Sequence, residues 1–521
     1  MIRAEYVAIV EGMSEGSNTV ITQPKPFVDL EDMKTNREVP KYATLEGNYW
    51  WLDGTYENFP NNPENIGYMS AIQSDSNGDI NVTLTREYDD QYASVGFTFD
   101  FDTNVDEYPT NVSISWYRDD ILIDSETFSP DSAKYFMAKN VSGFNKIVVN
   151  FTKLKSPNHY LKIFNIYDGY IRKFSQDEIS DISIIEQIEI DNSALPSNSI
   201  QMTLVNPQDL ALMFQRSLPI KVYKNDVLIG DFFIENSKNN YYKTVYNIDA
   251  SDYMNMLENQ LYMGGFYNNV TASDLIADVL GQIPYELDSN IGNLVMNGYM
   301  KAQTKREALR QIAFATNAII DTSRSNKIVI KKHPTVPINI PNSKIIGNSY
   351  NNNEFKRTTK YLLNETYYTS IEDETEIYNA VLTGTITLIF DQPYHNYTIT
   401  GGSIISTGSN YAIISGNGSN VLLVGKQYEE HTIQYTKENT NVVSTDLSNE
   451  ISYDISLKSN IDILAELKFV KSEISCDFKL TDEKVGDLVL INDQTARITS
   501  LNYNLVNGDI YASCSMEVYD E

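Results

Sequence analysis

The sequence predicts a multidomain, mainly β protein that contains one small α/β module. The chain has 521 residues, which is enough for roughly three to five domains. Tyrosine is frequent, with 36 residues, and phenylalanine adds 20 more. Aromatic and β-branched side chains suit pleated, half-buried strands, whereas the recurring Asn, Asp and Gly residues suit the turns between strands.

The N-terminal third is expected to be β throughout. Residues 2–11 alternate apolar and polar side chains, so residues 1–37 are interpreted as one strand and a connector that could join the first β-rich region further along. Over residues 38–168, short strand-like runs recur at close to the spacing of about 8–12 residues that is typical of β-sandwiches. We therefore expect a β-sandwich there, with strands near 79–84, 95–101, 112–117 and 146–151.

Residues 169–265 predict a second β-rich region with a barrel-like pattern. Asn206 and Pro207 predict a short helix start, because Asn suits the N-cap and Pro suits the first helical position. The expected strands lie at 182–190, 200–205, 220–223, 230–234 and 244–248.

Residues 266–335 contain the clearest helices. Thr271 can cap a helix whose apolar residues recur on one face from Leu275 to Ile283. Thr304 and Glu307 have the spacing of a capping box, in which the two side chains reciprocally bind the free amides at a helix start. A strand is expected at 327–330, which completes a compact helix-and-strand module.

Residues 336–521 return to β structure. Pro337 and Pro341 mark the connector. A Ser-, Gly- and Asn-rich excursion is expected near 375–440, followed by strands at 484–491, 497–501 and 510–518.

The chain is strongly acidic. It has 40 Lys and Arg residues against 70 Asp and Glu residues, a formal net charge of −30. Such a surface repels phosphate, so specific nucleic-acid binding and anionic-membrane binding are disfavoured. No run approaches the ~20 apolar residues that span a bilayer, and the opening residues lack the features of a signal peptide. We expect a protein made in a cytosol.

Cysteine and histidine, the residues of thiol and imidazole chemistry, are scarce. The chain has two cysteines, Cys476 and Cys514, and four scattered histidines. The cysteines fall in neighbouring predicted strands, which favours buried small hydrophobic side chains over a redox pair. No phosphate-binding loop or hydrolase motif is present. We expect no enzyme activity, no cofactor and no metal site.

Acidic clusters offer two weaker candidates for chemistry. The segment from Asp75 to Asp79 is similar to the start of a calcium loop, but Arg86 stands where a bidentate Glu is required, so a hairpin turn is favoured. Asp231, Asp249, Asp252 and residues 372–374 could form paired catalytic carboxylates. With so many acids in the chain, solvent-exposed faces are the better interpretation.

Two further features leave alternatives open. The aromatic residues Tyr49, Trp50, Trp51, Trp116 and Tyr117 suit either a sandwich core, which is favoured, or a glycan-stacking platform. Residues 298–333 carry a net charge of +6 and leave −36 for the remainder. This basic segment suits either ordinary solvated faces or a docking face for an acidic neighbour, such as another copy of the chain. Its cations are Lys301, Lys305, Arg306, Arg310, Arg324, Lys327, Lys331 and Lys332, and its acids are Glu307 and Asp321.

Three passages resemble tail proteins of bacteriophages. Residues 41–54 and 66–70 resemble a module in tail proteins of phages that infect clostridia and related Gram-positive bacteria. Residues 304–313 and 321–330 resemble the helix-plus-strand unit of tail hub proteins. Residues 485–487 and 497–501 are similar to the closing barrel of such hubs.

The resemblance implies a baseplate hub of the type found in contractile phage tails and tail-like bacteriocins. Such a hub is a homotrimer with two tandem β-barrels per subunit, and the ring adapts a six-fold tail tube to a three-fold spike. Here the barrels would be 169–265 and 336–521, and the 38–168 sandwich looks like an insertion.

The same resemblance implies partners and a location. The partners would be the tail tube protein, the spike protein, the tape-measure protein and other baseplate proteins. The chain would belong to a virion tail baseplate, or to a tail-like particle, assembled in the cytoplasm of the bacterial host. An acidic channel wall would let DNA or the tape-measure protein slide without sticking.

Three rival functions remain at the level of the sequence. A distal tail ring protein would assemble as a hexamer. A glycan-binding adhesin would act through the 38–168 sandwich. A cell-wall hydrolase fused to a tail part is the weakest, because no catalytic constellation is recognisable. Whether the tail contracts, and whether the particle carries DNA, stays open.

Overall fold

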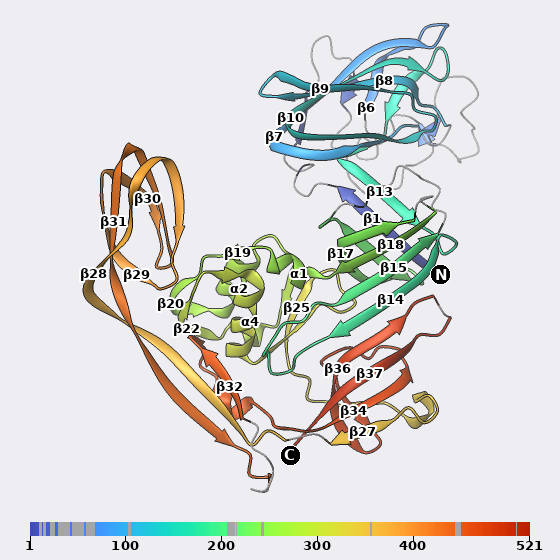
Figure 1. Cartoon of the computed structure of the whole chain (residues 1–521). Helices are drawn as coiled ribbons and strands as arrows, with labels where there is room; N and C mark the ends of the chain where they lie inside the picture. Colours follow the sequence, from blue (N-terminus) through green and yellow to red (C-terminus); the bar gives the residue numbers. More distant parts are fainter. Residues whose placement is uncertain are drawn as a thin grey trace. The chain divides into compact units, whose positions relative to one another are not determined.

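A computed structural model of the chain (Figure 1) describes residues 1–9, 13, 17–20, 27–29, 42–43, 57–58, 68–102, 106–205, 214, 216–240, 244–354, 357–442, 450–506 and 508–520. It confirms a mainly β, multidomain protein. The chain divides into two compact units. The N-terminal unit is Glu5–Lys173, and the main unit is Met1–Ala4 with Phe174–Glu521. No helix among the described residues is both long enough and apolar enough to cross a membrane.

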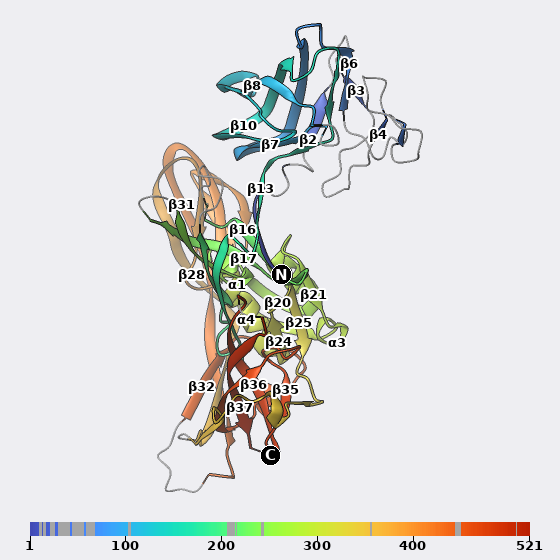
Figure 2. The ribbon, with the colours of Figure 1, turned by 90° about the vertical axis from the view of Figure 1, so that its right-hand side faces the viewer.

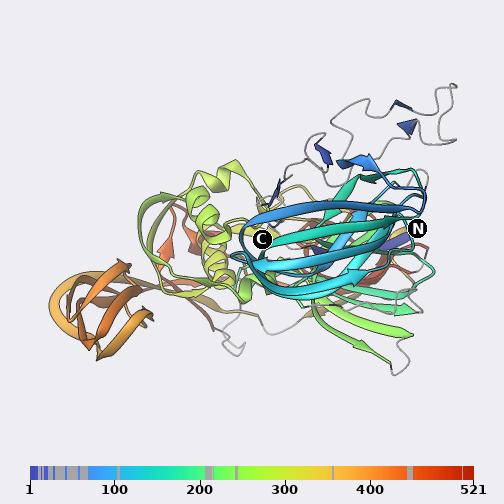
Figure 3. The same ribbon diagram turned by 90° about the horizontal axis from the view of Figure 1, so that it is seen from above.

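The N-terminal unit contains two sheets that share one aromatic core. One sheet has the order β12-β7-β10-β8-β9, with β2 beside β7, and the other has the order β11-β6-β3. Figure 2 shows the two groups of strands, and Figure 3 shows the long strands of the larger sheet side by side. Their bounds are β2 Ser17–Val20, β3 Phe27–Asp29, β6 Tyr68–Gln73, β7 Asp79–Asp100, β8 Pro109–Arg118, β9 Ile121–Phe128, β10 Lys134–Leu154, β11 Tyr160–Ile163 and β12 Asn165–Tyr167; a separate pair is β4 Tyr42–Ala43 and β5 Glu57–Asn58.

Alternation of apolar and polar residues produces this core. Along β7 and β8, the apolar side chains point to one face, and Phe97, Phe99 and Trp116 are fully buried. Leu161 and Ile163 of the smaller sheet belong to the same cluster. The residues expected as strands at 79–84 and 95–101 are extended as predicted, apart from Phe101, but they form one 22-residue strand, β7, and not two separate strands. β7 pairs with β10 on both sides of the polar stretch that suggested a turn, and the register of the pairing shifts across that stretch.

The main sheet has 13 strands in the order β13-β1-β16-β17-β18-β15-β14-β36-β37-β34-β27, with β35 pairing β36 and β26. Most of these strands belong to the main unit, whereas nearly all of β13 and part of β1 fall within Glu5–Lys173. The two β-rich regions meet where β14 pairs antiparallel with β36, from Ser183↔Asn504 to Gln187↔Ser500. They therefore share one hydrogen-bonded sheet. Its strands are β1 Ile2–Ile9, β13 Gly169–Phe174, β14 Ile179–Gln187, β15 Ser199–Val205, β16 Pro219–Lys224, β17 Val227–Asn239, β18 Val245–Ser251, β26 Ile338–Asn339, β27 Asn351–Glu354, β34 Val470–Lys479, β35 Leu488–Ile491, β36 Gln494–Asn504 and β37 Tyr511–Tyr519.

The sheet differs from the sequence-based expectation at the start of β35. The strand expected at 484–491 is shorter, because β35 begins only at Leu488. Gly486 has a φ of 83° and makes a turn just before it, a conformation that glycine adopts at little cost. The helix start expected at Asn206 and Pro207 lies outside the described residues.

The helix-and-strand module follows the first β-rich region. Thr271 and Thr304 cap α2 and α4 as predicted, accepting hydrogen bonds from the amides of Asp274 (3.1 Å) and Glu307 (3.2 Å). In place of the predicted reciprocal half of the capping box, the Glu307 carboxylate binds the Arg310 guanidinium. The bounds are α1 Tyr253–Glu258, β19 Leu261–Tyr262, β20 Gly265–Thr271, α2 Ala272–Leu280, β21 Tyr285–Leu287, α3 Ser289–Gly292, β22 Val295–Met300, β23 Gln303–Thr304, α4 Lys305–Thr316, β24 Ala318–Asp321 and β25 Ile328–Lys332.

The excursion expected near 375–440 is part of a long β arm, drawn in orange in Figure 1. Its strands β28 and β31 pair antiparallel over nearly their whole length, and β29 and β30 widen its end around a small core of its own. β32 pairs parallel with the start of β28. The bounds are η2 Asn342–Lys344, β28 Lys360–Ile389, β29 Tyr394–Thr400, β30 Gly402–Thr407, β31 Tyr411–Glu438, β32 Glu450–Ile455, β33 Leu457–Lys458 and α5 Ile463–Glu466.

A buried asparagine attaches the arm to the helix-and-strand module. Asn410 is fully buried, and its Nδ2 donates to the carbonyl oxygens of Met263 (2.7 Å) and Met300 (2.8 Å). Its Oδ1 accepts a hydrogen bond from the Tyr299 hydroxyl at 2.6 Å. The Phe266 ring lies beside that of Tyr428 on the arm, with centroids 4.5 Å apart. These contacts hold the end of the arm against β20 and β22.

Candidate functional site

The acidic residues singled out in the first β-rich region have separate structural partners. Asp231 forms an ion pair with Lys221 at 3.2 Å, and burial raises the pKa of its carboxyl group. Asp249 accepts a long hydrogen bond from Asn236 at 3.5 Å. Asp252 is the N-cap of α1 and accepts from the amides of Asn198 and Met254. These contacts describe local structure and do not form a catalytic carboxylate pair.

The remaining acidic candidates lie in ordinary structural positions. In the segment from Asp75 to Asp79, the Asp75 Oδ1 accepts from the amides of Asn77 (2.7 Å) and Asp79 (2.9 Å), which confirms the predicted turn. In the 372–374 cluster, Glu372 pairs with Lys426 across the arm. Among the described residues, no group of three or more His, Cys, Asp or Glu side chains is arranged to hold a metal ion.

The cysteines and the described tryptophan belong to the core. Cys476 and Cys514 are register partners on β34 and β37, and both are free and buried. Burial raises the pKa of the Cys476 thiol to about 11, which disfavours the reactive thiolate. Trp116 is fully buried, as the core interpretation predicts. Tyr49, Trp50 and Trp51 lie outside the described residues.

Most cations of the basic segment form ion pairs with carboxylates of the same chain. Five of its eight cations form ion pairs, so neither solvated faces alone nor an open docking face describes the segment. Lys301 and Lys332 are exposed. The pairs are Arg306–Glu258, Arg310–Glu307, Arg324–Glu186, Lys327–Glu286 and Lys331–Asp321.

Arg324 joins three parts of the main unit. Its Nε and Nη2 lie 3.1 Å from the two carboxylate oxygens of Glu186 on β14, and Nη2 also donates to the Glu483 carbonyl oxygen at 2.7 Å. The Tyr503 hydroxyl on β36 donates to Glu186 at 2.7 Å. A bidentate pair of this kind is charge-assisted and geometrically specific. The network therefore fixes the helix-and-strand module against the junction of the two β-rich regions.

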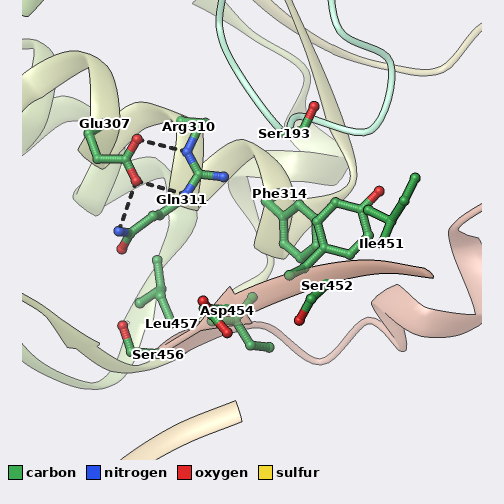
Figure 4. Close-up of a pocket in the computed structure, with 12 residues that line it drawn as sticks. Ser193, Glu307, Arg310, Gln311, Phe314, Ile451, Ser452, Asp454, Ser456 and Leu457 are labelled. Atoms are coloured by element: carbon green, nitrogen blue, oxygen red, sulfur yellow. Dashed lines mark hydrogen bonds and ion pairs between the residues drawn. The ribbon is translucent and has the colours of Figure 1, made fainter. Parts of the chain in front are cut away.

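A groove lies between α4 and β32. It encloses about 380 Å³ and is shown in Figure 4. One wall is a stripe of α4 that contains Glu307, Arg310, Gln311 and Phe314, spaced one helical turn apart. The opposite wall is the continuous segment 451–457, and Ser193 lies at the rim. The Phe314 and Tyr453 rings form part of its lining, with centroids 5.1 Å apart.

Sequence reasoning missed the groove and the Arg324 network. The helical spacing of Glu307, Arg310, Gln311 and Phe314 was present in the sequence, but only the apolar face of α4 was used. The opposite wall could not be found in this way, because β32 reaches α4 through long-range pairing with β28. Neither Arg324 nor Glu186 carries a local signal that they pair across 138 residues.

Comparison with known proteins gives structural neighbours only. No protein-family model matches the chain, and no curated protein matches it. Among solved structures, it is similar to a tail protein from Neisseria meningitidis MC58, with 11% identity over 66% of this chain and 93% of that one and a TM-score of 0.40.

Two further neighbours are prophage tail proteins. The 43 kDa tail protein of prophage MuSo2 from Shewanella oneidensis is 10% identical, with 67% of this chain and 95% of that one covered and a TM-score of 0.39. The prophage tail protein gp18 from Listeria monocytogenes EGD-e is 9% identical, with 67% and 91% covered and a TM-score of 0.40.

Proposed function

We propose that the chain is a structural baseplate hub of a phage tail or a tail-like bacteriocin. The observation that carries the proposal is the order of parts in the main unit. A β-rich region, a helix-and-strand module and a second β-rich region follow one another, and the two β-rich regions pair through β14 and β36. This is the order that the sequence resemblance implies for a hub, and the resembling residues 304–313 and 321–330 lie in the module between them.

In this proposal, three copies form a ring, and the paired β-rich regions of each copy present two similar surfaces around it. Six such surfaces match a six-fold tail tube, while the three copies match a three-fold spike. A closed ring buries complementary surfaces of identical subunits. The tail tube, spike, tape-measure and other baseplate proteins are the proposed partners, and the chain performs no reaction.

Subunit stoichiometry tests the proposal. Native mass spectrometry of the purified chain, mixed with its tail tube protein, is expected to show three copies per assembly. Six copies would support a distal tail ring protein instead, and a chain that stays monomeric in the mixture would contradict both. Electron microscopy of the intact particle, with an antibody against this chain, is expected to label the baseplate end of the tail.

A further inference from the structure

The outer edge of β32 borders the groove. The five-stranded sheet of the arm has the order β29-β31-β28-β32, so β32 is its last strand, and no other strand of the described chain pairs with the far side of β32. Five consecutive residues of β32, 451–455, line the groove, and so do Ser456 and Leu457 beyond its end. Side chains of an extended strand alternate between its two faces, so an unbroken run lines a cavity only when the strand's edge faces it.

A free strand edge offers backbone groups that an extended peptide can bind. Such an edge presents a row of amide N–H and carbonyl groups, and proteins use it to add a strand from a partner. Ile451 and Ile455 of β32 line the groove and are partly exposed, whereas Phe314 across the groove and Leu457 of β33 are buried. Alternate side chains of an added strand would meet the two isoleucines.

The charge around the groove is negative. Arg310 is its one lining cation, and its guanidinium is already bound by Glu307 and by the Asn192 carbonyl oxygen. Asp454 of β32 is exposed, and its Oδ1 accepts a hydrogen bond from the Asn364 side chain of β28 at 2.8 Å. The Asp191 carboxylate accepts a hydrogen bond from the Tyr453 hydroxyl at 2.6 Å.

Two further carboxyl groups, Glu189 and Glu517, lie close to Asp191, and a nearby positive charge would relieve the repulsion among the three. Burial, followed by the proximity of Asp191, raises the pKa of Glu189. Burial also raises the pKa of Glu517, again with Asp191 among its neighbours. No cation of the described chain forms an ion pair with Asp191, Glu189 or Glu517 within 4 Å. A positively charged ligand complements this surface, whereas a second copy of an acidic chain does not.

We propose that the groove between α4 and β32 binds an extended, positively charged peptide segment of another protein, which pairs with β32 as an added strand. The peptide's apolar side chains would contact Ile451 and Ile455, and its Lys or Arg would approach Asp454. This inference goes beyond the proposed hub function, because it requires no ring.

Panning a random dodecapeptide phage library against the full chain tests the proposal. The expected result is enrichment of peptides that alternate apolar residues and carry Lys or Arg. Synthetic copies should lose about tenfold in affinity on Asp454→Lys, and as much on Ser193→Trp, which fills the rim. Asp373→Lys makes the same charge change on an exposed part of β28 outside the groove and should stay within about twofold. Thermal unfolding checks that each variant is folded.

Hydrogen exchange supplies a second readout. When a peptide adds a strand, backbone amides within 450–455 gain hydrogen bonds and should exchange at least about tenfold more slowly. The proposal is overturned if panning enriches no peptides, if the selected peptides bind both groove variants unchanged, or if they bind while the β32 amides keep their exchange rates. The last outcome would mean that the peptides bind through their side chains and do not pair with β32.

Discussion

Arg324 shows how a single residue can hold several parts of the main unit together. It lies just after β24, with a φ of 49°, and its guanidinium reaches both β14 and the segment before β35. Glu186 is only 1% exposed, and Arg324 is the cation that pairs with it. Removing one member of a buried pair leaves the other charge without compensation, which is the costly case.

We therefore expect Arg324→Met to destabilise the main unit by about 3–5 kcal/mol. The measurement is urea unfolding followed by fluorescence at pH 7. Lys327→Met removes the exposed pair with Glu286 on the same module and should change the unfolding midpoint little. Equal effects of the two substitutions would mean that the Arg324 pair contributes no more than a surface contact.

His333 gives the main unit a specific acid sensitivity. Burial, with Arg497 and Lys468 nearby, lowers its pKa from 6.5 to about 4, and its Nε2 has no hydrogen-bond partner among the described residues. The unfolded chain takes up a proton below about pH 6.5, whereas the folded chain does so only near pH 4. Stability from this group is therefore complete above about pH 6.5 and is lost as the pH falls towards 4.

At pH 5, this loss amounts to about 2 kcal/mol relative to pH 7. His333→Leu should remove it, so the variant should lose less stability than the natural protein between pH 7 and pH 5. Chemical unfolding of both proteins at the two pH values measures the difference. Parallel losses in the two proteins would show that His333 is not the responsible group.

At the scale of elements, the arm depends on the polar contact of its end. Asn410 satisfies two backbone carbonyl oxygens and one hydroxyl in a site from which water is excluded. Buried polar groups left without partners cost about 1–3 kcal/mol each. The contact thus decides whether the end of the arm stays on β20 and β22.

We expect Asn410→Leu to weaken this attachment by about 3 kcal/mol. Hydrogen exchange should then become faster in β29, β30 and the first residues of β31, while the core strands of the N-terminal unit keep their rates. Asn420→Leu is the control, because Asn420 is exposed and binds only Asn379 along the arm. Unchanged exchange at the arm end in Asn410→Leu would contradict this account of the attachment.

The sequence predicted local structure well where the interacting residues lie within a few positions of each other. The caps at Thr271 and Thr304 depend only on residues three positions away, and both are formed. The two strands expected within β7 are one strand, because Asp89 and Asp90, which are typical turn residues, stay extended and exposed between two stretches that both pair with β10. The sequence predicts only an excursion where the long arm lies, because the arm's pairing joins residues up to 78 positions apart, as in Lys360↔Glu438, and local patterns do not indicate such pairs.

At the scale of the whole molecule, charge opposes self-association. Each chain carries −30, and most of the basic segment that might offset a neighbour's charge is paired internally. Salt screens repulsion between exposed charges over a Debye length of about 10 Å at 0.1 M. Assembly of several copies should therefore depend on ionic strength.

We expect self-association of the purified chain to strengthen as sodium chloride is raised from about 20 mM to about 300 mM. Sedimentation velocity at several protein concentrations measures the effect. Association that weakens with salt would show that attractive charge pairs across the interface dominate, as the docking-face interpretation of residues 298–333 required.

The global arrangement was the least predictable part. The composition and turn spacing indicated a mainly β chain, and this was confirmed. The pairing of β14 with β36 places Ser183 opposite Asn504. The alternation of apolar and polar residues in each strand does not indicate which strand it pairs with. The groove has the same origin, because long-range pairing brings β32 opposite α4.

The positions of β1 and β13 have a consequence for the history of the chain. These strands are neighbours in the main sheet, although 159 residues separate Ile9 from Gly169, a span that contains most of the N-terminal unit. A recombination event could delete or exchange that span and rejoin the chain with one tight connection. Lineages with and without it would then keep the same sheet, and the span could diverge at its own evolutionary rate.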